Sequence, residues 1–188
     1  MIRTALLARK HQARPAVLGF ESSVSYAALA RQAAALQAAL PAGDGRPAAL
    51  LLPDGSGFLA ALFAVLQAGG TALPLSTRLQ ADELASLLRL SPVRVILTSK
   101  ALLARCNAAA QACPVPPAIL CIEDVPPFSG AFPPVCTADP TAPMLLLASS
   151  GTTGRAKLVQ LSEHNMAFNA AAYLRHMGFE KYRDPDPR

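Results

Sequence analysis

The chain has 188 residues, of which 52% are hydrophobic and 15% charged, so it is long enough for one domain with a sizeable core. Its net charge of +5 comes from basic residues scattered without a Lys/Arg run, and this pattern gives no reason to expect a nucleic-acid partner. The most apolar helix candidate, residues 58–66, is far below the ~20 residues that span a bilayer, and no signal-peptide core is present, so we expect a cytoplasmic protein without a membrane span.

Candidate helices and strands alternate along the first half of the chain. In order, the patterns predict a short helix (4–12), a strand (16–20), a helix (27–40), a buried strand (48–52), a helix (56–68) and a strand (71–75). The helix at 27–40 has the clearest apolar stripe, because Leu29, Ala33 and Leu36 recur at helical spacing. Ser56 is the candidate N-cap of the next helix, and Gly69-Gly70 is its stop signal.

The same alternation continues to residue 122. The patterns predict a helix (81–90), a strand (94–98), a helix (101–112) and a strand (118–122). Strands that alternate with helices of this length pair in parallel through right-handed crossovers. The sequence therefore predicts an α/β fold, a layered and mostly parallel sheet flanked by helices on both faces, with ligands bound in the loops beyond the strand ends.

Residues 114–143 differ in kind, because nine of these thirty residues are proline. Proline removes a hydrogen-bond donor and fixes φ, so the part from about residue 123 to residue 143 is predicted to be an extended connection across the surface. The polar tail, residues 179–188, has no periodicity and is predicted to be disordered.

Cysteine and histidine spacing does not indicate a metal site. The cysteines show neither zinc-pair nor redox-pair spacing and are expected to be reduced thiols; they are Cys106, Cys113, Cys121 and Cys136. His164 and His176 lack carboxylate partners at metal-ligand spacing. We therefore predict no metal ligands, and we assign no catalytic residue within the chain.

The richest stretch for function follows an apolar run at residues 144–148. It is a loop of hydroxyl side chains and glycines, made of Ser149, Ser150, Gly151, Thr152, Thr153 and Gly154, and Lys157 follows it closely. Glycines let backbone N–H groups converge on an anion, hydroxyls add donors, and lysine adds positive charge. We expect strands 144–149 and 157–161 to pair antiparallel with this loop as the hairpin tip, and Ser162 to cap a helix that reaches Met177.

Composition alone is also compatible with an ordinary solvated turn. A Walker A loop is excluded, because that motif needs lysine directly after the second glycine, whereas two residues separate Gly154 from Lys157.

The segment S-S-G-T-T-G-R-A-K resembles the phosphate-binding signature of the adenylate-forming superfamily, which includes acyl-CoA synthetases, adenylation domains of nonribosomal peptide synthetases and luciferases. Residues 24–29 (V-S-Y-A-A-L) and 66–75 (L-Q-A-G-G-T-A-L-P-L) resemble two structural motifs of that family. The three motifs occur in the expected order, and the resemblance covers roughly residues 16–177.

The resemblance implies a function. Members of the family bind Mg-ATP, join a carboxylic acid to AMP with release of pyrophosphate, and pass the acyl group to the thiol of CoA or of a phosphopantetheinyl carrier protein. It implies nucleotide contacts at the loop residues and lysine named above. Because members are much longer, the resemblance identifies residues 1–178 as part of the large N-terminal domain, and the isolated chain is expected to be inactive, with exposed apolar surfaces that favour self-association.

The chain departs from the family pattern at three positions. Ala156 stands where proline is usual, Leu158 where glycine is usual, and Glu163 where histidine is common. The last two favour an alternative, a non-catalytic interaction module or one subunit of a split enzyme. A third interpretation is a small nucleotide-binding domain that is complete by itself and binds Mg-ATP without a partner.

Overall fold

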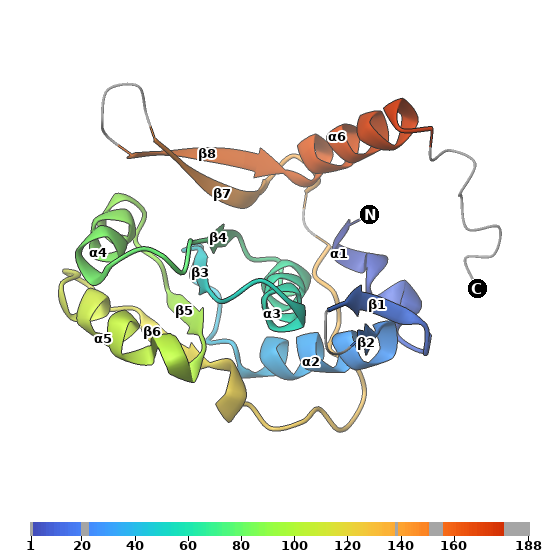
Figure 1. The fold of residues 1–188 in the computed structure, drawn as a ribbon, viewed down its shortest axis with the longest axis horizontal. Helices are drawn as coiled ribbons and strands as arrows, with labels where there is room; N and C mark the ends of the chain where they lie inside the picture. The colour runs from blue at the N-terminus through green and yellow to red at the C-terminus, as the bar shows by residue number, and fades with distance from the viewer. Residues whose placement is uncertain (1, 20–22, 138, 151–155, 179–188) are drawn as a thin grey trace.

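The computed structural model describes residues 2–19, 23–137, 139–150 and 156–178, and these are built around a six-stranded sheet of order β6-β5-β3-β4-β7-β8 (Figure 1). The strands are β3 (Ala48–Leu51), β4 (Ala72–Pro74), β5 (Val95–Thr98), β6 (Ala118–Cys121), β7 (Pro143–Ser150) and β8 (Ala156–Ser162). The pairs from β6 through β7 are parallel, and β8 pairs antiparallel with β7. The predicted mostly parallel sheet is confirmed.

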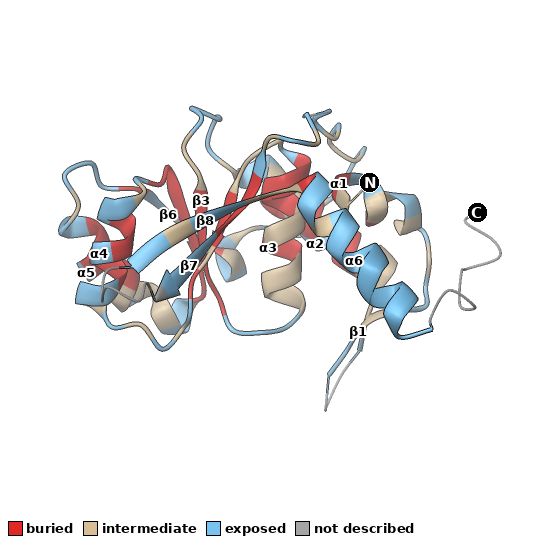
Figure 2. Cartoon of the chain, turned by 90° about the horizontal axis from the view of Figure 1, so that it is seen from above, coloured by how far each residue is buried: buried red, intermediate tan, exposed pale blue. Residues whose placement is uncertain are grey.

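Helices cover both faces of the sheet, as predicted. On one face α2 (Tyr26–Ala39) packs against α3 (Ser56–Gln67), and on the other α4 (Ala81–Leu90) packs against α5 (Leu103–Gln111). Successive residues of a strand point to opposite faces, so β3 contributes Leu50 to the core beneath α2 and α3 and Leu51 to the core beneath α4 and α5. Figure 2 shows this buried interior in red.

The predicted strand near residue 16 forms, but outside the central sheet. It is β1 (Pro15–Leu18), and it pairs antiparallel with β2 (Ser23–Ser25) in a separate two-stranded sheet. The expectation that this strand joins the parallel sheet is therefore wrong. Pairing with a strand close in sequence closes a short loop, which has a low entropic cost.

Two helix predictions need correction, one over its whole length and one at its start. The helix predicted at 4–12 is instead one short turn, α1 (Ile2–Ala5), followed by a 3-10 turn, η1 (Leu7–Arg9). A helix this short is not stable alone, so tertiary contacts such as the burial of Leu6 decide its shape. The helix predicted at 101–112 begins with a separate 3-10 turn, η2 (Lys100–Leu102), before α5.

Glycines define both ends of α3. Ser56 is the first residue of the helix and not its cap; Gly55 occupies the cap position with φ of 144°, which favours glycine. At the other end Gly69 adopts φ of 78°, and a Cβ atom there would lie 2.6 Å from the Cys136 Sγ atom. Both the backbone conformation and the close approach therefore require glycine at position 69.

The proline-rich segment connects β6 with β7 across the surface. After the 3-10 turn η3 (Ile122–Asp124), the described residues before Pro143 form neither helix nor strand. The Gln37 side chain donates to Pro134 O at 3.0 Å and the Cys136 N–H donates to Gln67 O at 2.8 Å, so the segment is attached to α2 and α3. The four cysteines are free thiols.

The last described helix, α6 (Glu163–His176), follows β8 directly, as predicted. The Ser162 hydroxyl accepts a hydrogen bond from the Asn165 N–H at 3.2 Å, and the Asn165 side chain accepts one from the Ser162 N–H at 2.9 Å. This reciprocal cap sets the start of the helix. Within the described residues, none of the helices combines the length and the apolar character that crossing a membrane requires. The tail at 179–188 lies outside the described residues.

Candidate phosphate-binding site

The candidate site lies at the outer end of the β7–β8 hairpin. β7 is buried from Met144 to Leu146 and exposed from Leu147 to Ser149. Ser149 pairs directly with Lys157 across the two strands. Residues that face each other across an antiparallel pair project to the same side of the sheet, so the Ser149 hydroxyl and the Lys157 ammonium share one face of the hairpin.

The structure brings three of the predicted site residues together. Besides the Ser149–Lys157 pair, Ser150 pairs with Ala156 at the end of the ladder. The other predicted contacts, Gly151, Thr152, Thr153 and Gly154, lie outside the described residues. The ladder nevertheless confirms the predicted hairpin, because it brings the residues before and after the loop into register.

Polar contacts leave the site available to an anion. The Ser149 hydroxyl donates to Lys157 O at 3.4 Å, a long hydrogen bond that a phosphate oxygen can replace. Both side chains are exposed, and within the described part of the chain no carboxylate forms an ion pair with Lys157. A hydroxyl donor beside an unpaired ammonium suits a phosphate group.

The hairpin opens at the edge of the sheet where parallel-sheet proteins bind ligands. Because β7 runs parallel to β4, with Leu145 opposite Ala72, the carboxyl ends of β3, β4 and β7 lie at the same edge. A cavity of about 520 Å³ lies just beyond β3 and β4. Its lining residues are Leu52, Asp54, Phe58, Pro74, Leu75, Ser76, Thr77 and Arg78.

The lining of this cavity includes one acidic residue, Asp54, and one basic residue, Arg78, and sequence reasoning missed Arg78. Its side chain is exposed, whereas the loop that carries it is held in place, because the Arg105 guanidinium donates to Thr77 O and to Leu79 O from α5. The available signal was an arginine a few residues after a buried strand of a parallel sheet. The arrangement provides a second positive charge at the edge where the candidate loop lies.

Leu158 departs from the family pattern without obstructing the Ser149–Lys157 face. Its side chain lies on the opposite face of β8 from Lys157, because adjacent residues of a strand alternate. There it is half-buried and packs against the core beneath α4 and α5. A bulky residue at this position therefore has a packing role.

Glu163, the other departure, is buried rather than placed at the site. Its carboxylate lies 3.7 Å from the Arg3 Nε atom and accepts a hydrogen bond from the Arg3 N–H at 3.2 Å. It therefore ties the start of α6 to the N-terminal segment.

The described residues of the site, a hydroxyl and an ammonium group, suit a phosphate group rather than a bare metal ion. Hydroxyl and ammonium groups donate hydrogen bonds to phosphate oxygens. The described residues contain no group of three His, Cys, Asp or Glu side chains that could hold a metal. Mg²⁺ is commonly bound through substrate phosphates and water with few protein ligands. In such a site it would arrive with ATP.

The chain matches the sequence profile of a family described as AMP-binding enzyme over residues 5–187. It is 31% identical over 166 residues to the phenyloxazoline synthase MbtB of Mycobacterium tuberculosis, a match that covers 86% of this chain. The chain spans only 4% to 11% of the length of the first curated relatives that it matches.

Several solved structures share the fold, and two of them illustrate the similarity. An adenylation and carrier-protein unit, McyG A-PCP in complex with phenylalanyl-adenylate, superimposes with a TM-score of 0.79 at 19% identity and covers 95% of this chain and 30% of its own. The anthranilate CoA ligase AuaEII in complex with anthranoyl-AMP superimposes with a TM-score of 0.75 at 17% identity and covers 90% of this chain and 35% of its own. In both, the matched region is about a third of the longer chain.

Proposed function

Because the chain belongs to the AMP-binding enzyme family, we propose that it supplies the phosphate-binding hairpin of an ATP-dependent, AMP-forming ligase. The observation that carries the proposal is the register of the hairpin, which sets Lys157 opposite Ser149 at the carboxyl edge of the sheet. The proposed substrates are a carboxylic acid, Mg-ATP and an acceptor thiol.

The reaction proceeds in two steps. A carboxylate oxygen of the acid attacks the α-phosphorus of ATP, the bond to the β-phosphate oxygen breaks, and pyrophosphate leaves. A thiolate then attacks the acyl carbon, the bond to the AMP oxygen breaks, and AMP is released. Charge develops on the leaving pyrophosphate during the first step, so fixed donors at that position accelerate it.

Each residue of the hairpin has a defined part in the proposal. Lys157 neutralises charge on the β- and γ-phosphates, and the hydroxyls of Ser149, Ser150, Thr152 and Thr153 donate to their oxygens. Gly151 and Gly154 allow the backbone N–H groups to approach the same oxygens. Mg²⁺, when bound with ATP, would reduce the negative charge of the phosphates.

The acceptor is a thiol in either branch of the proposal. The MbtB relative and the McyG A-PCP structure favour a phosphopantetheinyl carrier protein, whereas the AuaEII structure favours CoA. A transfer assay with both acceptors on the complete protein separates the two. ATP and free thiols are compatible with the predicted cytoplasmic location.

The 188-residue chain by itself is proposed to be inactive. Catalysis requires that the carboxylate, the α-phosphate and the stabilising cations be held together in the correct geometry. In the proposal the hairpin contacts only the β- and γ-phosphates. The test is a pyrophosphate-release assay on the isolated chain with a panel of carboxylic acids. No carboxylate-dependent release is expected, and measurable release contradicts this part of the proposal.

A second candidate function, a subunit that binds further polypeptide, is favoured by the surface of α6. Beyond Met166 the helix is exposed on all sides, and Phe168, Tyr173 and Leu174 are 71%, 59% and 49% exposed (Figure 2). Isolated helices of this length are marginal in water, so packing against another surface stabilises α6. We propose that the covering surface is the remainder of a ligase of this family or a second copy of the chain.

Size-exclusion chromatography with Phe168→Gln and Leu174→Gln tests this second function. The parent chain is expected to self-associate as its concentration rises and the double variant to remain monomeric. A parent chain that remains monomeric at high concentration contradicts self-association.

A further inference from the structure

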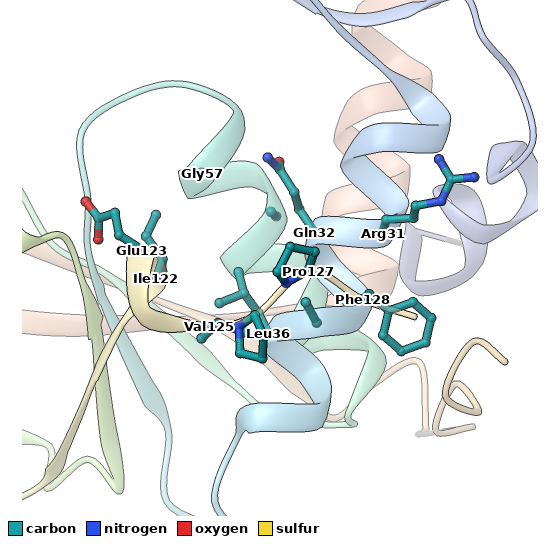
Figure 3. A pocket seen from close by; sticks show the side chains of 12 residues that line it. Arg31, Gln32, Leu36, Gly57, Ile122, Glu123, Val125, Pro127 and Phe128 are labelled. Carbon is teal, nitrogen blue, oxygen red and sulfur yellow. The ribbon is translucent and has the colours of Figure 1, made fainter. Parts of the chain in front are cut away.

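A second cavity lies far from the hairpin, between α2, α3 and the segment that follows β6 (Figure 3). Its volume is about 410 Å³, within the range of about 300–1,000 Å³ that small-molecule sites occupy. α2 and α3 line it with Arg31, Gln32, Ala35, Leu36, Gly57 and Ala60, and residues 122, 123 and 125–128 complete the wall. The η3 turn follows β6, at the opposite end of the sheet from β8.

The walls of this cavity are mostly apolar, and side-chain packing fixes both of its ends. A Cβ atom at Gly57 would lie 2.9 Å from the Ile122 Cδ1 atom, so the absence of a side chain there seats Ile122 against α3. At the other end the Phe128 ring contacts the Phe132 ring in a tilted arrangement, with centroids 5.5 Å apart and an interplanar angle of 39°. The cavity therefore has an aliphatic end and an aromatic end, joined by Pro126 and Pro127.

Charge is distributed unequally along the cavity. Glu123 lies at the aliphatic end, and its carboxylate already accepts hydrogen bonds from the Lys100 N–H at 3.2 Å and from the Cys121 thiol at 3.1 Å. Arg31 lies on the Phe128 side, and Figure 3 shows its guanidinium directed away from the Phe128 ring; this exposed group forms no hydrogen bond or ion pair with the described residues. The Lys10 ammonium lies 5.1 Å from the centre of the Phe132 ring and adds positive charge on that side.

We propose that this cavity binds a small apolar molecule that carries a carboxylate. The apolar part fills the space between α2, α3 and the two prolines. The exposed Arg31 side chain rotates toward the cavity, and its guanidinium, whose planar fork matches carboxylate geometry, meets the carboxylate. Carboxylic acids are also the substrate class of the proposed function, but this cavity is separate from the hairpin and does not involve Lys157. The inference therefore stands independently of the proposed function.

The test titrates the folded 188-residue chain with three probes that share one apolar body: 4-phenylbutyrate, 4-phenylbutanol and 4-phenylbutylamine. Binding is followed by calorimetry and by shifts in amide NMR signals. The acid is expected to bind, and to shift signals of residues 31–36 and 122–128, at least about tenfold more tightly than the alcohol, because a hydrogen bond between charged groups is stronger than a neutral one. The amine is expected to bind more weakly still.

Two variants locate the site, and a third is a matched control. Arg31→Gln removes the charge and is expected to weaken binding of the acid about tenfold, down to the affinity of the alcohol. Ala35→Leu fills the cavity with a residue that is also a good helix former and is expected to weaken binding of all three probes. Arg89→Gln changes an exposed arginine on α4 and is expected to leave binding unchanged.

Three results overturn the proposal. One is the absence of binding by any probe to the folded chain. Another is equal affinity for the acid and the alcohol, and the third is an Arg31→Gln or Ala35→Leu variant that binds as the parent does. Circular dichroism on each variant verifies that it is folded, so a loss of binding reports on the cavity and not on the fold.

Discussion

Arg3 and Glu163 form an ion pair across 160 positions of sequence, with side chains only 4% and 3% exposed. The Arg3 guanidinium also donates to Leu66 O at 2.8 Å, near the end of α3. The pair therefore connects the N-terminal segment, α3 and the first residue of α6. Since α6 continues directly from β8, the same contacts anchor the base of the hairpin that carries Lys157.

Breaking this ion pair is expected to destabilise the fold. Glu163→Gln leaves Arg3 buried and charged without its partner, and removal of one member of a buried pair typically costs about 3–5 kcal/mol of unfolding free energy. Urea denaturation of the parent, Glu163→Gln, Arg3→Met and the double variant measures the effect. The double variant is expected to lose less than the sum of the two single variants, and strict additivity would show that the pair does not interact.

Gly69→Ala is expected to destabilise the chain by about 1–3 kcal/mol, because alanine disfavours the left-handed backbone at this position and its methyl group meets the Cys136 side chain. Gly43→Ala is the matched control. Gly43 has no atom within 4 Å of an added Cβ and no positive φ, so the control should be neutral or slightly stabilising. Equal effects from thermal unfolding of both variants would contradict the role given to Gly69.

Because the Cys106 thiol is buried, we expect the free energy of unfolding to fall at alkaline pH. Burial raises the pKa of Cys106 above its ordinary value of 9.0, and the neighbouring Thr98 hydroxyl, whose oxygen lies 3.3 Å from the Cys106 Sγ atom, offsets only part of this shift. As pH rises through the ordinary value, the unfolded chain releases this proton before the folded chain does, so the free energy of unfolding falls.

Unfolding free energies between about pH 8.5 and 10.5 measure that contribution. Cys106→Ala is expected to flatten the decline. Val93→Ala removes an apolar group from the same core and keeps the thiol, so it should lower stability while retaining the slope of the parent. A Cys106→Ala slope equal to that of the parent would show that the thiol does not contribute.

The central sheet was predictable because its strands are short apolar runs between turn residues. The continuous run that forms β3 is buried at all four positions, as a strand covered on both faces requires. The hairpin was also predictable, because an apolar run, a loop of hydroxyls and glycines, and a second strand follow one another without interruption. In each case the signal is local in sequence.

The features that were missed depend on partners distant in sequence or on the backbone. The apolar run at β1 gives no sign that its partner is β2 rather than the central sheet. Glu163 reads as a departure from a family motif until its buried partner, Arg3, is known. The leucine at position 158 is likewise explained only by the core that its side chain contacts, and the glycine at position 55 only by its positive φ.

Calorimetric titration of the folded chain with Mg-ATP and, separately, with pyrophosphate tests the central claim most directly. The parent and Arg89→Gln are expected to bind both, and Lys157→Ala is expected to weaken both by about tenfold or more, because it removes the charged member of the Ser149–Lys157 pair. A folded parent that binds neither, or a Lys157→Ala variant that binds as tightly as the parent, would contradict the assignment of the hairpin as a phosphate-binding site.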